Sequence, residues 1–152
     1  MKRDFELLMA DVKRLYEDLM QMSPVTRDTL GDCDYPGVYF FTEGDRHLYT
    51  GRTRRLRVRL MQHSRPSIKD APFAFRLARE STGRLKASYK TEGSRDELMA
   101  DPVFIKSFAE QKQRISKMLI RYVRVEDDVT QALLEIYTST LLDTPHNEFR
   151  TT

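Results

Sequence analysis

The sequence has few cysteines and no long apolar run, and each shortage excludes a class of protein. Cys33 is the single cysteine among 152 residues, so one chain can form neither a disulfide framework nor a metal site built from cysteines. Residues 1–22 carry acidic side chains throughout and lack the uninterrupted apolar segment of a signal peptide. No other segment is apolar for long enough to span a membrane. These shortages predict a cytoplasmic protein in a reducing compartment.

Acidic residues are missing from one segment, although the charges of the whole chain nearly balance. The chain has 26 Lys and Arg against 23 Asp and Glu, a net charge of +3. Between Arg46 and Arg65 there are seven arginines, two histidines and no acid. A basic surface on a nearly neutral protein favours a polyanionic partner such as a nucleic acid. A solvated helix face without a partner is the plainer interpretation of the same arginines.

Length and apolar content predict a single α+β domain. The chain is long enough for one compact core, and 39% of its residues are hydrophobic. Apolar residues recur at helical spacing over residues 3–22, which predicts an N-terminal amphipathic helix. Its apolar stripe either joins the core or makes a homodimer. Residues 1–35 are thus interpreted as this helix and a linker.

Two short runs rich in aromatic and β-branched residues, GVYFFT and RHLYTG, predict a β-hairpin around the turn residues EGD. The register of this hairpin decides where Tyr39 and Tyr49 point. A loop centred on Gly44 places the two tyrosines opposite each other, with both phenols on one sheet face. A two-residue loop at Gly44–Asp45 places them on opposite faces. We favour the first arrangement.

A basic helix is expected directly after the hairpin. Thr53 can cap its N-terminus, and the helix extends to about His63. Arg59 and His63 are one turn apart on the same side of it. Because this helix follows Gly51 directly, its free amides and its dipole form a natural phosphate site.

A basic insertion is expected at residues 64–100. Arg76 and Arg79 lie on a short helix predicted over residues 72–82, with aromatic residues interleaved. This pattern is typical of a second basic patch, and equally of a solvated helix whose aromatic residues belong to the core. The residues expected to bind phosphate or nucleic acid are Gly51, Arg52, Thr53, Arg55, Arg76 and Arg79.

The C-terminal third of the chain predicts one more strand and a last helix. The run MLIRYVRVE alternates well enough for a strand, which completes a small antiparallel three-stranded sheet flanked by helices. Asp128 caps a helix that extends through Leu142. Its polar stripe is expected to consist of Gln131, Glu135 and Thr138. Its core-facing residues are expected to be Val129, Leu133, Ile136 and Leu141.

This order of elements, with the residues at its corners, resembles the GIY-YIG nuclease family over about residues 36–148. The first triad of the family corresponds to Gly37-Val38-Tyr39, and the second to Tyr49-Thr50-Gly51. Arg59 stands eight residues after Gly51, and His63 four residues later, as the helix arginine and histidine of the family do. Glu135 resembles the metal-binding glutamate of the family, and Asn147 resembles the asparagine that often follows it.

The resemblance implies a divalent-metal-dependent endonuclease that hydrolyses phosphodiester bonds, with DNA favoured and RNA still open. The implied site residues are Tyr39, Tyr49, Arg59, His63, Glu135 and Asn147, with one Mg²⁺ or Mn²⁺ held by Glu135. Tyr39 would be the general base, its pKa lowered by neighbouring cations. Arg59 would stabilise the charge on phosphorus. Tyr49 would bind the phosphate or orient the water, His63 would relay a proton or bind phosphate, and Asn147 would brace the site.

Two other classes of function remain open from the sequence. A non-catalytic nucleic-acid-binding module on the same scaffold explains the arginines equally well, because neutralising phosphates needs only positive charge. An interaction protein could instead dock a partner on its N-terminal helix. Only the nuclease needs Tyr39, Arg59 and Glu135 together.

Overall fold

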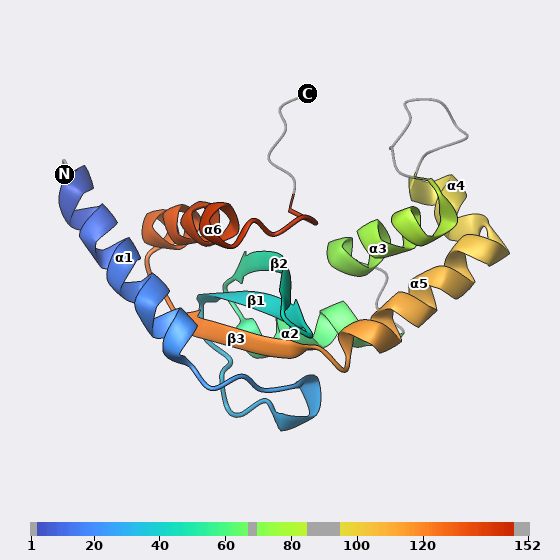
Figure 1. Cartoon of the computed structure of the whole chain (residues 1–152), viewed down its shortest axis with the longest axis horizontal. Helices are drawn as coiled ribbons and strands as arrows, with labels where there is room; N and C mark the ends of the chain where they lie inside the picture. Colours follow the sequence, from blue (N-terminus) through green and yellow to red (C-terminus); the bar gives the residue numbers. More distant parts are fainter. Residues whose placement is uncertain (1–2, 67–69, 85–94, 148–152) are drawn as a thin grey trace. The chain divides into compact units, whose positions relative to one another are not determined.

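The computed structural model describes residues 3–66, 70–84 and 95–147. It confirms the α+β class and the three-stranded antiparallel sheet flanked by helices. In chain order its elements are α1 (Phe5–Gln21), η1 (Arg27–Thr29), β1 (Gly37–Glu43), β2 (Arg46–Thr53), α2 (Leu56–Ser64), α3 (Pro72–Thr82), α4 (Arg95–Ala100), α5 (Pro102–Ile115), β3 (Leu119–Arg124) and α6 (Asp128–Leu142) (Figure 1). Within the described ranges, no helix is both long and apolar enough to cross a membrane.

The chain divides into two compact units. The first unit comprises residues 1–60 and 118–152 and contains the sheet, α1 and α6. The second comprises residues 61–117 and contains α3, α4 and α5, so the insertion expected at 64–100 falls within it. Helix α2 begins in the first unit and ends in the second.

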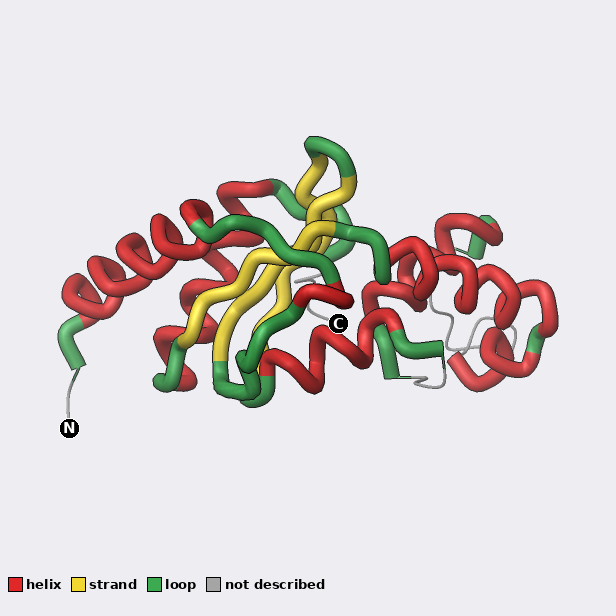
Figure 2. The backbone as a smooth tube through the Cα atoms, turned by 90° about the horizontal axis from the view of Figure 1, so that it is seen from below, coloured by secondary structure: helices red, strands yellow, loops and turns green. Residues whose placement is uncertain are grey.

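Strand β1 is the centre of the sheet, between β2 and β3, and is antiparallel to both (Figure 2). Its even-numbered residues Val38 and Phe40 are fully buried in a core with α1 and α6. Its odd-numbered residues face the other side, where Leu56 of α2 lies close to Gly37. Both faces of β1 are therefore covered, which explains why the strand is apolar almost throughout.

The apolar stripe of α1 lies in the core of the first unit. Val12 and Leu19 are fully buried and pack with Leu134 of α6 against the sheet. Helix α1 begins at an Asp4 cap, whose carboxylate accepts hydrogen bonds from the amides of the first turn. The helix predicted over residues 3–22 is confirmed, with the stripe serving the core.

The hairpin turn contains two residues. Glu43 pairs with Arg46 across Gly44 and Asp45, and Gly44 has a φ of 63°. Glycine adopts this left-handed backbone without steric cost, which suits a two-residue turn. The expected loop centred on Gly44 is therefore wrong, and the shorter alternative is correct.

A β-bulge next to the turn restores the expected face of the two tyrosines. The register shifts between Phe41 and Thr42, which leaves Leu48 as the extra residue on β2. After the shift Tyr39 pairs with Gly51, and Phe41 pairs with Tyr49. Tyr39 and Tyr49 are therefore not opposite each other, as predicted, but they do share one face of the sheet.

Helix α2 begins later than the sequence predicts. Strand β2 continues through Thr53, and α2 starts at Leu56, so the helix does not follow Gly51 directly. The Thr53 Oγ1 accepts a hydrogen bond from the Arg55 amide at 3.1 Å, in the turn before the helix. Thr53 thus closes the turn between strand and helix instead of capping the helix.

Helix α6 buries only part of the side predicted: Leu133 packs against the core, but the other three residues expected there are exposed. Its exposed apolar residues are Val129, Ile136 and Leu141, which are 47%, 50% and 53% exposed. Its buried residues are Thr130, Gln131, Leu134, Thr138 and Ser139. Polar side chains occupy the buried side because Gln131 and Ser139 bond to backbone carbonyls there, which offsets their loss of water. The cap is Asp127, not Asp128, and its carboxylate accepts from the Thr130 amide.

Candidate active site

Tyr39 is central to the candidate site, and Gly51 makes room for its ring. The two residues are cross-strand partners, and a Cβ atom on Gly51 would overlap the hydroxyl and ring carbons of Tyr39. Gly51 belongs to β2, one of the two edge strands of the sheet. The Tyr39 phenol therefore lies over Gly51 of β2, and its side chain is only 1% exposed.

Side chains from three elements interact with the Tyr39 phenol. Arg59 of α2 hydrogen-bonds to its oxygen, and Tyr49 of β2 acts on its charge. Glu135 of α6 interacts electrostatically with the same phenol. The fold thus brings together four of the six residues that the sequence assigns to catalysis.

Burial governs the acidity of the Tyr39 phenol. It raises the pKa of Tyr39 well above its usual value, and the neighbouring Tyr49 raises that pKa further. Arg59 lowers the pKa, but by less than burial raises it. Arg59 thus lowers the pKa of Tyr39, as predicted. The pKa is nevertheless raised overall, so the prediction of a lowered pKa is wrong.

Glu135 is a half-buried carboxylate with one cationic partner. Its side chain is 23% exposed, and its Oε1 lies 4.0 Å from Nε of Arg52. Burial raises the pKa of Glu135, and Arg52 partly offsets this rise. The ionised carboxylate therefore lacks full compensation within the chain and would be stabilised by a further cation.

The donor set suits one hydrated Mg²⁺ or Mn²⁺. Across residues 3–66, 70–84 and 95–147, no three His, Cys, Asp or Glu side chains gather to form a metal site. Mg²⁺ does not need such a cage, because it keeps several waters and binds one or two carboxylates together with substrate phosphates. Glu135 can supply that carboxylate beside the Tyr39 phenol.

Replacing Glu135 by glutamine should stabilise the metal-free protein at neutral pH. Because burial raises the folded-state pKa of Glu135, ionising it costs folding free energy. This cost is absent below the unfolded pKa of about 4.3 and fully present above the folded pKa. Thermal unfolding should show a higher Tm for Glu135→Gln than for the wild type at pH 7, and an unchanged Tm at pH 4.

The exposed Glu17 of α1 provides the control, since Glu17→Gln should leave Tm nearly unchanged at both pH values. Adding Mg²⁺ at pH 7 should raise the Tm of the wild type and not that of Glu135→Gln. A lower Tm for Glu135→Gln than for the wild type at pH 7 would contradict the claim that ionised Glu135 costs folding free energy.

Asn147 ties the segment after α6 to the second triad. Its Oδ1 accepts from the Thr50 amide at 2.8 Å, and its Nδ2 donates to the Thr50 carbonyl at 2.6 Å. Thr144 donates to the same Oδ1 at 2.7 Å. Because Thr50 lies between Tyr49 and Gly51, these bonds suit a residue that braces the site.

Gln131 of α6, which the sequence places only on a polar stripe, connects this helix to β2. It is 2% exposed, and its Nε2 donates to the carbonyls of Thr53 and Val125 at 3.1 and 3.2 Å. Its Oε1 accepts from Arg52 Nη1 at 3.5 Å. The signal that could have identified Gln131 is its position one helical turn before Glu135.

Contacts within the first unit already use part of the expected phosphate site. Arg55 forms a two-pronged ion pair with Asp34, at 2.7 and 3.3 Å. The Leu56 amide at the start of α2 donates to the Tyr35 carbonyl at 3.0 Å. The start of α2 therefore offers fewer free donors than the sequence predicts.

Three predicted residues belong to the second unit. His63 is fully buried there, with its ring 6.4 Å from that of Phe73. Arg79 is 8% exposed, and its guanidinium carbon lies 5.6 Å from the centre of the Phe75 ring. Phe73 and Phe75 are buried, which agrees with the core interpretation of these aromatic residues. Arg76 is half-buried on the same helix.

Comparison of the chain with protein-family models, with curated proteins and with solved structures gave no match. The site is therefore interpreted from the residues that it brings together.

Proposed function

We propose that the chain is a divalent-metal-dependent endonuclease of the GIY-YIG type that hydrolyses phosphodiester bonds, with DNA as the favoured substrate. One observation carries the proposal: Arg59 and Glu135, from two different helices, both act on the buried phenol of Tyr39. Cross-strand packing would explain the position of Tyr39. It would not explain why an arginine hydrogen-bonds to its hydroxyl while the charge of a half-buried glutamate also acts on it.

Each side chain has a role that follows from its chemistry. Arg59 presents a planar, permanently charged donor that stabilises the negative charge growing on the phosphate oxygens. Tyr49 is half-buried on the same sheet face and can donate a hydrogen bond to a phosphate oxygen. Glu135 would hold the divalent cation, which supplies Lewis-acid stabilisation of the phosphate and the leaving oxygen.

Tyr39 is the proposed general base, and it would act only when the cation and the substrate are bound. In the resting protein it keeps its proton, because burial opposes the phenolate. Its oxygen is fixed by Arg59, so the direction of proton transfer is set before the substrate binds. A second positive charge at Glu135 would favour the phenolate in the same way as Arg59 does.

A second candidate function is a nucleic-acid-binding module without catalysis. The burial of Tyr39 favours it, since a phenol with a raised pKa is a weak base near neutral pH. The exposed arginines of β2 and α2 would then bind phosphates only. This candidate gives no role to Glu135, whose negative charge opposes phosphate binding.

A cleavage assay separates the two candidates. Wild type and Glu135→Ala would be incubated with labelled single-stranded, duplex and branched DNA and with RNA, in Mg²⁺, Mn²⁺ or EDTA. We expect metal-dependent cutting by the wild type and none by the variant, with nucleic-acid binding retained by both. Salt-sensitive binding without cutting of any substrate would favour the binding module.

A further inference from the structure

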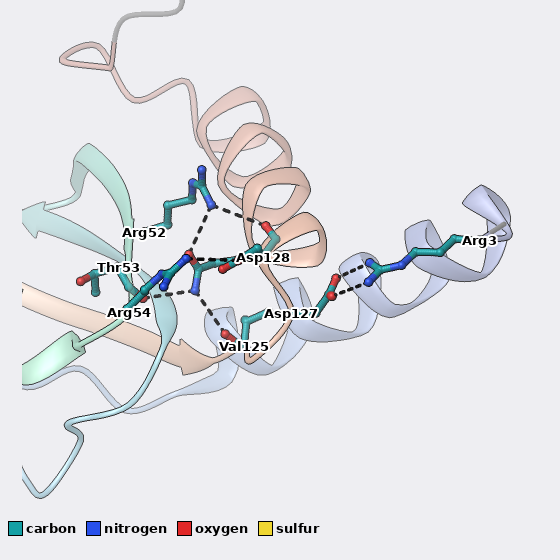
Figure 3. A network of polar contacts seen from close by, with 8 residues as sticks. Arg3, Arg52, Thr53, Arg54, Val125, Asp127 and Asp128 are labelled. Carbon is teal, nitrogen blue, oxygen red and sulfur yellow. Dashed lines mark hydrogen bonds and ion pairs between the residues drawn. The ribbon is translucent and has the colours of Figure 1, made fainter. Parts of the chain in front are cut away.

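Long contacts hold Arg52 in place. Its Nε lies 4.0 Å from Glu135 Oε1. Its Nη1 lies 3.5 Å from Gln131 Oε1 and 3.5 Å from the Asp128 carbonyl, and Figure 3 draws the contact with Asp128. Two other arginines of the first unit are held more closely. Arg55 reaches Asp34 at 2.7 Å, and Arg3 reaches Asp127 at 2.8 and 2.9 Å. Arg52 is thus held more loosely than these two.

Arg52 lies between the anchored side chain of Gln131 and the solvent. Gln131 is buried and anchored by its two bonds to backbone carbonyls, so its Oε1 cannot follow a moving arginine. The Arg52 side chain itself is 41% exposed. It can leave Gln131 and Glu135 and turn towards solvent without disturbing the backbone of β2 or α6.

Arg52 and a divalent cation would occupy the same surroundings of one carboxylate. Arg52 is the ion-pair partner of Glu135 among the described residues. A cation bound to Glu135 would sit within a few ångströms of the guanidinium, and like charges at that range repel strongly in a partly buried site. The Glu135 carboxylate can therefore bind either Arg52 or the divalent cation, but not both at full strength.

We propose that Arg52 is the resting counter-ion of Glu135, and that a divalent cation displaces it, which releases the guanidinium to bind a phosphate of the nucleic acid. The inference rests on the proposed function and adds a regulatory step to it. In the resting protein Arg52 partly compensates the charge of Glu135 and lowers its affinity for the cation. Binding of the cation then strengthens the hold on nucleic acid, and by reciprocity nucleic acid strengthens the binding of the cation.

The first test is Mn²⁺ binding, followed by the electron paramagnetic resonance of free Mn²⁺ without nucleic acid. Arg52→Gln should bind Mn²⁺ about tenfold more tightly than the wild type, because the competing charge is gone. Arg54→Gln is the matched control. Arg54 is two residues away and 82% exposed, and it pairs with Asp128 at 3.5 Å instead of Glu135. Its replacement should change Mn²⁺ affinity by less than about twofold.

The second test needs no metal. In EDTA, Glu135→Gln should bind a short labelled duplex about fivefold more tightly than the wild type, because Arg52 is free to reach a phosphate. This gain should vanish when Arg52→Gln is added. Asp128→Asn removes a negative charge beside Arg54 and controls for the general loss of repulsion. Any gain that it gives should persist in the Arg52→Gln background.

The outcomes separate this inference from the proposed function. Unchanged or weaker Mn²⁺ binding by Arg52→Gln would overturn the exchange and leave the nuclease proposal standing. So would a gain from Glu135→Gln that survives in the double variant. If neither the wild type nor Arg52→Gln binds Mn²⁺, the metal site itself fails and the inference falls with it. Thermal melts of each variant would confirm that it folds.

Discussion

Replacing Tyr39 by phenylalanine should lower the cleavage rate about a thousandfold while leaving DNA affinity nearly unchanged. Phenylalanine keeps the ring that lies over Gly51 and packs edge-on against Phe41 at 5.8 Å. It removes only the oxygen that Arg59 hydrogen-bonds. Single-turnover cleavage in Mg²⁺ and fluorescence anisotropy in EDTA would measure the two quantities.

Tyr16 of α1 provides a matched control. It is another partly buried phenol of the first unit, and its ring packs edge-on against Tyr137 at 5.2 Å, outside the candidate site. Tyr16→Phe should cleave at the wild-type rate. Equal activity of Tyr39→Phe and Tyr16→Phe would show that the Tyr39 hydroxyl has no part in the reaction.

The pH dependence of cleavage follows from the same phenol. A general base acts in its ionised form, and burial raises the pKa of Tyr39, so only a small fraction is ionised near neutral pH. That fraction grows about tenfold per pH unit below the pKa. The logarithm of the wild-type rate should therefore rise with a slope near one between about pH 7 and 9. A flat profile would point to a base with a lower pKa.

Gly51→Ala should strongly destabilise the first unit. The new Cβ would overlap the ring and hydroxyl of Tyr39, and neither side can yield, because Tyr39 is buried and Gly51 is paired within the sheet. We expect a loss of about 3 kcal/mol in the free energy of unfolding, at the upper end for overpacking. Cleavage should be lost as well, since the phenol must move. Urea unfolding followed by circular dichroism would measure the loss.

The same substitution at Gly31 is the control. A Cβ atom there would meet nothing within 4 Å, and Gly31 has no positive φ that would disfavour alanine. Gly31→Ala should stay within about 0.5 kcal/mol of the wild type. If Gly51→Ala were as stable as Gly31→Ala, the Tyr39 ring could not lie over Gly51.

The elements of the fold were predictable because their signals are local. The period of the apolar residues indicates α1, and the aromatic runs around EGD indicate the hairpin. The register of the hairpin was not predictable, because a bulge at Leu48 depends on how β2 pairs with β1 and leaves no mark in composition. The shared face of Tyr39 and Tyr49 was thus expected for the wrong reason.

The buried side of α6 was missed for a different reason. Hydrophobic periodicity assigns Val129 and Ile136 to the core, yet both are about half exposed. Gln131 takes the buried side because backbone carbonyls at Thr53 and Val125 satisfy its amide, and a sequence does not show which carbonyls will be near. These two bonds of Gln131, which a hydrophobic pattern cannot predict, also fix the side chain that Arg52 contacts.

The residues of the candidate site could be predicted only together, from the family resemblance, and not one by one. Tyr39, Arg59 and Glu135 come from three elements, and no local pattern links them apart from the resemblance to a nuclease family. The interactions of Arg59 and Glu135 with Tyr39 arise from tertiary packing, which brings residues of α2 and α6 near β1. His63 belongs to the second unit, because the division between the two units falls inside α2, three residues before it.

The extra residue in β2 also limits which insertions and deletions the hairpin can tolerate. In a regular hairpin with this two-residue turn, tyrosines separated by an odd number of residues would share a face, whereas Tyr39 and Tyr49 are ten apart. Loss of Leu48 alone would remove the bulge and leave the tyrosines nine apart, so a regular hairpin would keep both phenols on one face of the sheet. A hairpin that kept the two-residue turn and the ten-residue spacing but paired without the bulge would send one phenol to the opposite side. Related chains with this turn should therefore keep the pair either ten apart with the bulge or nine apart without it.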